Sequence, residues 1–179
     1  MKANMLMVAL AACVGCGAIT IDGAGPTTYT GPFSGPFVRT TVSQGNMGGG
    51  VITCFNTYTF SGTMSMMLRQ SGSALTGSTS ITGTQAETGK SGDPTCPLYG
   101  SNSLEWSPPV SASASALTFS DQRVSTNGNY SVTSKVTFVG TLSGGVVTGT
   151  LTLSRTGTGS ITGTTISETG SSTMSVALH

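Results

Sequence analysis

The most regular feature of this chain is an alternation of apolar and polar residues that begins at Ile52 and continues to Gly83. A period of two indicates β-strands with one buried face and one solvent-exposed face. The first run is too long for one flat strand, so we expect a bend near Ser61–Gly62. A turn at Ser71–Gly72 separates it from a second run, which predicts a β-hairpin. The inward positions of the first strand are Ile52, Cys54, Asn56, Tyr58, Phe60, Gly62, Met64, Met66 and Leu68.

The turn position also predicts which residues face each other across this hairpin. With Ser71–Gly72 as the turn, large residues repeatedly meet small ones on the same face. Such pairing is typical of a concave, filled interior. The predicted cross-strand pairs are Leu68–Leu75, Met66–Gly77, Met64–Thr79, Gly62–Ile81 and Phe60–Gly83.

A similar hairpin follows around Gly144–Gly145. This turn places Phe138 opposite Leu151. A turn at Ser143–Gly144 would shift the partners by two residues and keep the same face buried. The register of the second hairpin therefore stays open, whereas its buried face does not.

Shorter alternating runs predict further strands, with another hairpin turn at Asn127–Gly128. The chain has 26 Gly and only 7% charged residues, but the Thr, Val and Ile in its alternating runs favour an ordered fold over disorder. We expect an all-β fold, an antiparallel up-and-down β-barrel of about eight strands whose last strand pairs with the first. A two-sheet β-sandwich has the same alternation and is the alternative. The further strands are expected at residues 37–42, 111–119, 130–142, 161–166 and 173–178.

Charge and residue type argue against several classes of function. The formal net charge is +1, and no basic stripe is present to drive binding to nucleic acid. The one histidine, His179, ends the sequence, which disfavours a catalytic triad, and His and Cys are too few and scattered for a metal site. The acidic residues do not fall at inward positions of the strands predicted most clearly, which disfavours a glycosidase pair. We therefore expect a non-catalytic protein with no metal, no cofactor and no nucleic-acid partner.

The N-terminus has the pattern of a secretion signal. Lys2 precedes an apolar run at residues 5–12 that is too short to span a bilayer as a mature helix. The sequence Leu10-Ala11-Ala12-Cys13 resembles the lipobox of bacterial lipoproteins, and a simple signal peptide with a chance cysteine is the alternative. The resemblance implies cleavage before Cys13, a lipid anchor on that residue and a membrane attachment in the bacterial cell envelope. We expect a signal peptide at 1–12, a lipidated Gly-, Thr- and Pro-rich tether at 13–36 and one all-β domain at 37–179.

The other cysteines predict one disulfide. Secreted chains occupy compartments where disulfides persist, so we expect Cys54 to bridge Cys96 and to tie an irregular segment at 85–109 to the barrel wall. Two buried free thiols are the alternative. The bridge would contribute about 2–4 kcal/mol. Cys16 is expected to be an unpaired thiol in the tether, because no second pair or histidine supports a metal or redox site. Trp106, in the same segment, either plugs one end of the core or touches a ligand at the barrel mouth.

The segment Gly62–Gly77 resembles the strand-turn-strand units of small bacterial lipocalin-like and avidin-like barrels. Two functions stay open for such a secreted protein. One is binding of a small apolar ligand in the barrel interior, which methionines suit. The other is a structural or adhesion role at the cell surface with a filled core. The expected ligand-lining residues are Tyr58, Phe60, Met64, Met66, Phe138, Leu151 and Trp106.

Overall fold

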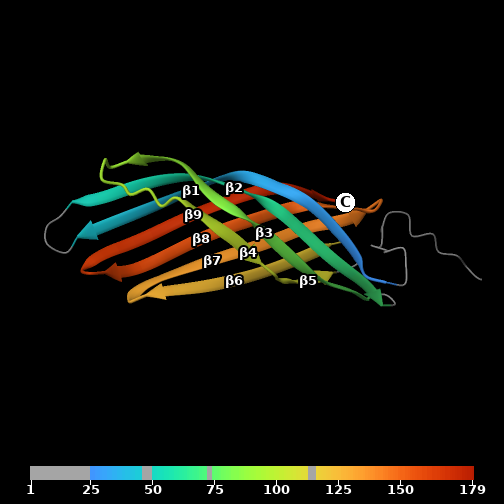
Figure 1. The fold of residues 1–179 in the computed structure, drawn as a ribbon. Coiled ribbons are helices and arrows are strands. Elements are labelled where there is room, and N and C mark those ends of the chain that lie inside the picture. The colour runs from blue at the N-terminus through green and yellow to red at the C-terminus, as the bar shows by residue number, and fades with distance from the viewer. Residues whose placement is uncertain (1–24, 46–49, 72–73, 113–115) are drawn as a thin grey trace, which may run out of the picture.

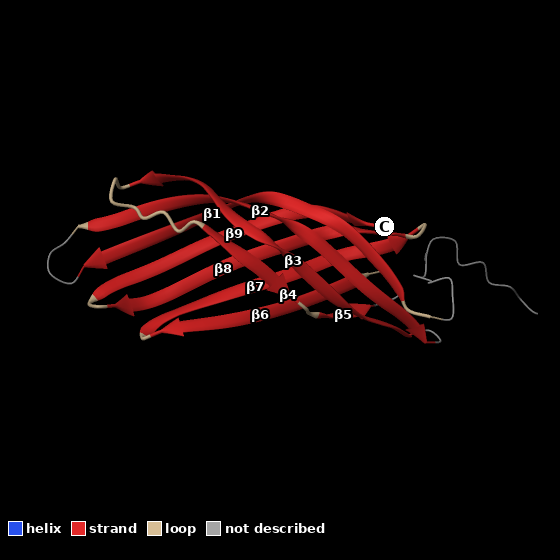
Figure 2. Ribbon diagram, viewed as in Figure 1, coloured by secondary structure: helices blue, strands red, loops and turns tan. Residues whose placement is uncertain are grey.

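The structure is a computed structural model that describes residues 25–45, 50–71, 74–112 and 116–179. The predicted signal peptide, the lipobox Cys13 and Cys16 lie outside the described residues. Every regular element within the described residues is a β-strand (Figures 1 and 2). The strands are β1 (Thr27–Gly45), β2 (Val51–Ser71), β3 (Ala74–Gly92), β4 (Ser101–Trp106), β5 (Pro109–Ala112), β6 (Leu117–Asn127), β7 (Asn129–Ser143), β8 (Val146–Ile161) and β9 (Thr164–Leu178).

The nine strands form one antiparallel sheet that closes on itself into a barrel-like ring. β1, β2 and β3 are neighbours, and β5 to β9 follow one another around the ring. β4 and β5 both pair with β3. β9 then pairs with β1, from Val38–Ser171 to Gly45–Thr164, and reciprocal backbone hydrogen bonds join Thr30 to His179. The predicted all-β barrel fold, with the last strand paired to the first, is confirmed.

The ring is least continuous between β4 and β6. β5 pairs with β6 only at Ser111–Thr118 and Ala112–Leu117, whereas β4 pairs with β3 alone. In the part of the chain that the structure describes, no backbone ladder joins β4 to the remaining length of β6. We call this stretch the seam, and side chains rather than backbone hydrogen bonds span it.

β1 begins ten residues earlier than expected. Residues 27–36, assigned to the tether from their Gly and Pro content, form the first half of this strand. Both prolines face outward, and they fall between Thr30 and Val38, where β1 has no register partner on β9. Proline is tolerated there because its missing N–H interrupts no ladder on that side. Gly31 allows close approach, since a Cβ on it would lie 2.1 Å from the Ala177 carbonyl oxygen.

The first hairpin has the expected buried face in a different register. Met66 lies opposite Thr79 and Leu68 opposite Gly77, so each predicted partner is displaced by two residues. Ser71 pairs with Ala74, whereas the predicted turn would have paired Arg69 with Ala74. A displacement of two residues keeps every side chain on its face, which is why the buried set survives the wrong register.

The second hairpin has the register given by a turn at Gly144–Gly145. Phe138 pairs with Leu151 and Leu142 with Val147, as that turn predicts. The two glycines have φ of 58° and 78°, the left-handed backbone that a two-residue hairpin turn requires.

Two other expectations about the strands are wrong. Thr162 and Gly163, with φ of 47° and 78°, form the turn between β8 and β9 in place of the strand expected at 161–166. The run at 111–119 is divided between β5 and β6. β2 continues without a break through Ser61–Gly62, and the register shift in its pairing with β3 lies at Thr57/Tyr58.

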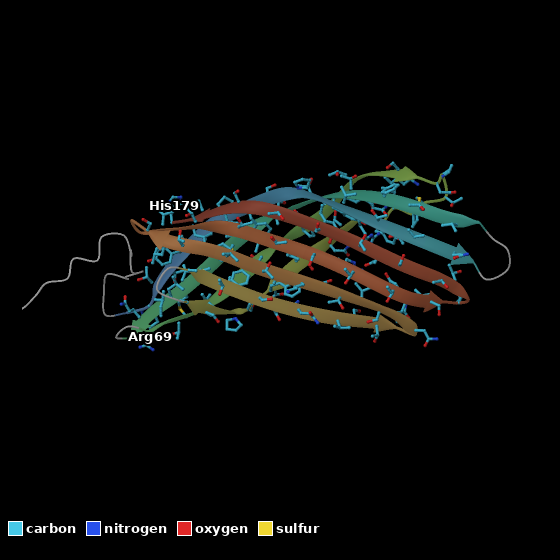
Figure 3. All side chains as sticks on the ribbon, turned by 180° about the vertical axis from the view of Figure 1, so that it is seen from behind. Arg69 and His179 are labelled. Carbon is cyan, nitrogen blue, oxygen red and sulfur yellow. A yellow bond between two sulfur atoms is a disulfide. The ribbon has the colours of Figure 1, made fainter. Side chains whose placement is uncertain are left out.

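The barrel interior has two ends of different character. The packed end is where β1 begins and β9 finishes, and Figure 3 shows Arg69 and His179 together there. The polar end is where β1 finishes and β8 turns into β9, and its inward positions include Arg39, Asn56 and Glu168. The packed end and the adjoining middle contain the apolar side chains with at most 1% exposure, Met64, Met66, Leu68, Ile81, Leu117, Val136, Phe138, Val147, Leu151 and Leu178.

Candidate functional site

A cavity of about 680 Å³ lies in the polar end of the barrel. Residues from β1, β2, β3, β4, β6, β7, β8 and β9 line it, so most strands of the ring contribute. The lining combines aromatic and aliphatic residues with charged ones, which alternate along the same strands, as Phe37 and Arg39 do on β1. The lining residues used below are Phe37, Arg39, Thr41, Phe60, Tyr99, Leu104, Trp106, Arg123, Tyr130, Ser134, Leu153, Arg155 and Glu168.

Of the seven residues expected to line a ligand site, the cavity includes Phe60 and Trp106. Met64, Met66 and Leu151 are completely buried, and Phe138 is 1% exposed. The ring of Phe138 fills the space above a pair of glycines, since a Cβ on Gly140 or Gly149 would lie 2.4 or 2.6 Å from its Cζ atom. These residues therefore form packed core instead of lining the cavity.

Tyr58, the remaining expected ligand-lining residue, is buried beside the cavity. Its hydroxyl has no hydrogen-bond partner among the described residues. Burial raises its pKa to about 12, although the nearby Arg39 charge acts in the opposite direction. The phenol therefore stays neutral and able to donate at physiological pH.

Arg39 is the most unusual side chain of the site. It is 7% exposed, yet its Nε and Nη2 atoms have no hydrogen-bond partner within the described residues. Its guanidinium carbon lies 3.8 Å from the centroid of the Tyr99 ring and 5.4 Å from that of Tyr58. The two rings interact with the charge, but neither supplies a hydrogen-bond acceptor in the plane of the guanidinium group.

Three more buried polar atoms without partners surround Arg39. Asn56 is its cross-strand neighbour on β2, Tyr58 is two residues further along β2, and Thr41 is two residues further along β1. The Asn56 Oδ1, Tyr58 hydroxyl and Thr41 Oγ1 atoms are all unpaired in the described structure. Each such atom costs about 1–3 kcal/mol when it is buried without a partner. A cluster of them around one arginine therefore indicates a place for an occupant that can hydrogen-bond.

The second arginine of the cavity is already paired. The Arg155 Nε donates to Glu168 Oε1, and Glu168 also hydrogen-bonds the Tyr130 hydroxyl. Burial, and then the contact with Glu168, raises the pKa of Tyr130 above its ordinary value. Glu168 is 6% exposed, so this carboxylate is committed to two partners inside the barrel wall.

A loop held by the predicted disulfide places Tyr99 over Arg39. The bridge between Cys54 and Cys96 is present, with a Cα–Cα distance of 5.6 Å. Glu87 accepts hydrogen bonds from Asn56 Nδ2 at 2.7 Å and from the backbone N–H groups of Tyr99 and Gly100 at 2.5 and 3.0 Å.

These contacts also decide the charge of Glu87. Burial tends to raise its pKa, but the hydrogen bond from Asn56, those from the two N–H groups and the Arg39 charge bring the pKa below its ordinary value. Glu87 is therefore ionised at neutral pH and fixes both Asn56 and the backbone at Tyr99.

A cation–π contact spans the seam. The guanidinium carbon of Arg123, on β6, lies 4.4 Å from the centroid of the Trp106 ring, on β4. Trp106 is 4% exposed and pairs with Ile81 of β3, so it belongs to the core and the cavity wall at once. The burial of Trp106 agrees with its expected place in the core, whereas its contact with a ligand stays a prediction.

The polar residues of this site were not identified from the sequence, although a signal for them exists. On a strand, residues an even number of positions apart face the same side. Arg39 is related in this way to Phe37, Arg155 to Leu153, and Glu168 to Met174. Continuing each alternation would have placed all three charges inside the barrel. Glu87 carries the same signal, since it continues the inward alternation of Ile81 along β3. Tyr99 carries none, because it lies in a loop.

Within residues 25–45, 50–71, 74–112 and 116–179, no group of three or more His, Cys, Asp or Glu side chains could hold a metal ion. The same residues contain no helix long and apolar enough to cross a membrane. Comparisons of the chain with protein-family models, with curated proteins and with solved structures find no match. Its function must therefore be inferred from the cavity and the residues around it.

Proposed function

We propose that this protein is a non-catalytic, secreted and lipid-anchored barrel of the bacterial cell envelope that binds a small molecule in its polar-end cavity. The observation that carries the proposal is the coincidence of a cavity of about 680 Å³ with buried polar atoms that have no partner. Ligand sites commonly have volumes of roughly 300–1,000 Å³, with apolar walls and a few converging polar groups. The cavity has both properties.

The ligand we propose is amphipathic rather than purely apolar. Phe37, Phe60 and Leu153 offer apolar contact in the cavity, and Arg39 and Arg123 offer charge. A purely apolar ligand would leave the unpaired donors of Arg39 buried without an acceptor, which is unfavourable. A molecule with an apolar body and a polar group suits both surfaces.

The arrangement of acids supports binding over catalysis. Glu168 is engaged by Arg155 and Tyr130, and Glu87 by Asn56 and two backbone N–H groups. An acid–base pair needs a carboxyl group free to exchange a proton with a substrate. These two carboxylates are instead held in structural contacts, and Glu105, the other acid that lines the cavity, is solvent-exposed.

The position of the proposed anchor suits a binding role. β1 begins at the packed end (Figure 1), and the residues that line the cavity belong to the opposite, polar end. A lipid on Cys13, upstream of β1, would therefore leave the cavity on the side away from the membrane. We expect Cys13→Ser to abolish lipid labelling and to release the protein in soluble form, and unchanged membrane fractionation would refute the anchor.

The alternative is a structural or adhesion module with a filled core. The packed end favours it, because Met64, Met66 and Leu151 are fully buried. It accounts less well for Arg39, since a purely structural interior gains nothing from a buried guanidinium group without an acceptor.

The binding proposal can be tested with N-phenyl-1-naphthylamine, an uncharged fluorescent probe. Trp106 is the only tryptophan and lines the cavity, so a probe bound there accepts its fluorescence energy. Ser134 faces inward on β7 opposite Arg155, and Ser134→Phe places a ring in the cavity. We expect saturable binding by the wild type and at least about a tenfold loss in this variant.

Ser120→Phe is the matched control, because Ser120 is exposed on the outer face of β6. It should bind the probe as the wild type does. Equal binding by Ser134→Phe, or no saturable binding by the wild type of either this probe or its sulfonated analogue, would favour the filled structural module instead.

A further inference from the structure

We propose that the ligand carries an oxyanion, a carboxylate or a phosphate- or sulfonate-like group, and that Arg39 binds it through its Nε and Nη2 atoms. This inference rests on the proposed ligand-binding function and adds the chemical class of the ligand. It follows from which atoms of Arg39 lack partners, from what fixes this side chain and from the charges around the cavity.

The two unpaired nitrogens of Arg39 form one edge of the guanidinium group. Nε–H and one N–H of Nη2 point in the same direction, a fork that matches two oxygens of a planar carboxylate or of a tetrahedral oxyanion. A single neutral carbonyl oxygen can be shared by both donors only with bent hydrogen bonds, whereas two oxygens of one anion accept one straight hydrogen bond each and also neutralise the buried charge. The class of ligand that suits this edge best is therefore an oxyanion.

Arg39 is held in a fixed place before any ligand arrives. Tyr99 covers one face of the guanidinium group at 3.8 Å, and Tyr58 lies at 5.4 Å. Tyr99 is in turn fixed by Glu87, which accepts its backbone N–H, within the loop that the Cys54–Cys96 bridge ties to β2. A preorganised donor pair loses little entropy when the anion binds.

The acids described beside Arg39 are engaged by other groups. Glu87 interacts electrostatically with Arg39, but hydrogen bonds from Asn56, Tyr99 and Gly100 occupy its oxygens. Glu168 pairs with Arg155 instead. Of the charged residues that line the cavity, Arg123, Lys135 and Glu105 are solvent-exposed, and the two remaining arginines outnumber the one remaining acid, so the charge of the interior also favours an anion.

Unpaired hydroxyl and amide groups next to Arg39 extend the same site. The hydroxyls of Thr41 and Tyr58 lack partners in the described structure and can each donate to a further oxygen. Asn56 Oδ1, an acceptor, suits a water molecule or a hydroxyl group of the ligand. The cluster thus offers more donors than acceptors, as expected of an oxyanion site.

The test compares 8-anilinonaphthalene-1-sulfonate with N-phenyl-1-naphthylamine, which has the same aromatic body without the sulfonate. We expect the wild type to bind the sulfonate at least about tenfold more tightly. Arg39→Gln should remove about ten- to a hundredfold of the affinity for the sulfonate and leave that for the neutral probe unchanged. Arg39→Lys keeps the charge without the fork, so it should also lose affinity for the sulfonate.

Arg69→Gln is the matched control, because it removes the same charge from an exposed residue at the packed end (Figure 3). Competition by 2-naphthoate and by 2-naphthyl phosphate for the bound sulfonate shows whether the site prefers a carboxylate or a phosphate. Displacement by either compound supports the proposal. Circular dichroism shows whether each variant folds. If Arg39→Gln does not fold, the affinity of Arg39→Lys for the sulfonate tests the proposal in its place.

Two failures are distinguishable. If neither probe binds the wild type, the ligand-binding function itself is refuted. The oxyanion alone is refuted if the neutral probe binds and the wild type has no higher affinity for the sulfonate. It is also refuted if the higher affinity for the sulfonate persists in the Arg39 variants. In both cases water is the partner of Arg39.

Discussion

The two ends of this barrel are built from the same strands and have opposite interiors. At the packed end, inward positions alternate between large apolar residues and glycines, and Phe138 fills the space above Gly140 and Gly149. At the polar end, the same strands place Arg39, Arg155 and Glu168 at inward positions, and a cavity of about 680 Å³ remains. The alternation of a strand thus fixes which residues face inward but not whether they fill the interior.

The difference has a physical cause in the side chains themselves. Apolar side chains opposite glycines interlock to the density of a protein core. Arginine and glutamate must instead satisfy charge and hydrogen bonds, and they do so along the wall, as Arg155 and Glu168 do with each other. The weak seam between β4 and β6 lies beside the same end, where Arg123 and Trp106 replace a backbone ladder.

The largest effect should come from truncating two leucines on β8. Leu151→Ala, in the packed interior opposite Phe138, is expected to cost about 2–5 kcal/mol of unfolding free energy, because it creates a closed void. Leu153→Ala lies on the cavity wall and enlarges a space that already exists, so it should cost about 1–2 kcal/mol less. Urea denaturation of both variants measures the difference, and equal costs would mean that the two ends are packed alike.

Replacing a glycine by alanine tests the packed end by adding volume instead of removing it. A Cβ on Gly77 would lie 2.3 Å from the Met67 carbonyl oxygen and 2.9 Å from the Leu68 side chain. Gly77→Ala should therefore cost about 1–3 kcal/mol. Gly89→Ala has no atom within 4 Å of the new carbon and should stay within about 0.5 kcal/mol of the wild type. A tolerated Gly77→Ala would contradict the close β2–β3 contact.

Arg39→Met should stabilise the ligand-free protein. Removing a buried charge with two unpaired donors is favourable, and the loss of the contact with Tyr99 offsets part of the gain, leaving about 1 kcal/mol. Arg69→Met, at an exposed residue, should change little. Thermal unfolding without added anions compares the two, and marked destabilisation by Arg39→Met would indicate a structural role for this arginine.

The smallest effect is expected on the pH dependence of stability, through the Glu87 carboxylate. Its folded-state pKa is lowered, so its contribution to stability is present above its ordinary pKa of 4.5 and is lost as the pH falls through the lower folded value. Between pH 6 and pH 3 the wild type should lose more stability than Glu87→Gln, by less than about 1 kcal/mol, because Glu87 is partly exposed. Parallel pH profiles would show that Glu87 does not hold the Tyr99 loop.

Particular residues show how far the sequence could predict this molecule. The alternation from Ile52 to Leu68 was sufficient for the all-β class and for the inward face of this strand, because a period of two is a local property, but it fits a sandwich as well as a barrel. The register of that hairpin was wrong, because pairing Ser71 with Ala74 in place of Arg69 with Ala74 leaves the alternation unchanged. The disulfide between Cys54 and Cys96 was predicted from the secreted context and is present.

The cavity could be predicted only in part. Its inward arginines lie an even number of positions from inward apolar residues, so the alternation predicts that they face the interior. Whether space remains beside them depends on strands far apart in the chain, since Arg39 meets Asn56 of β2 on one side and Gly170 of β9 on the other. Tyr99 covers Arg39 through a loop whose path depends on the disulfide and on Glu87, and no local pattern encodes that path.

The most direct measurement is a crystal structure of the protein with 8-anilinonaphthalene-1-sulfonate. We predict one bound molecule in the polar end, with its rings near Trp106 and Phe60 and two sulfonate oxygens within hydrogen-bond distance of Arg39 Nε and Nη2. Electron density for the probe only on the outer surface, or an interior filled equally at both ends, would contradict a barrel with one packed end and one binding end.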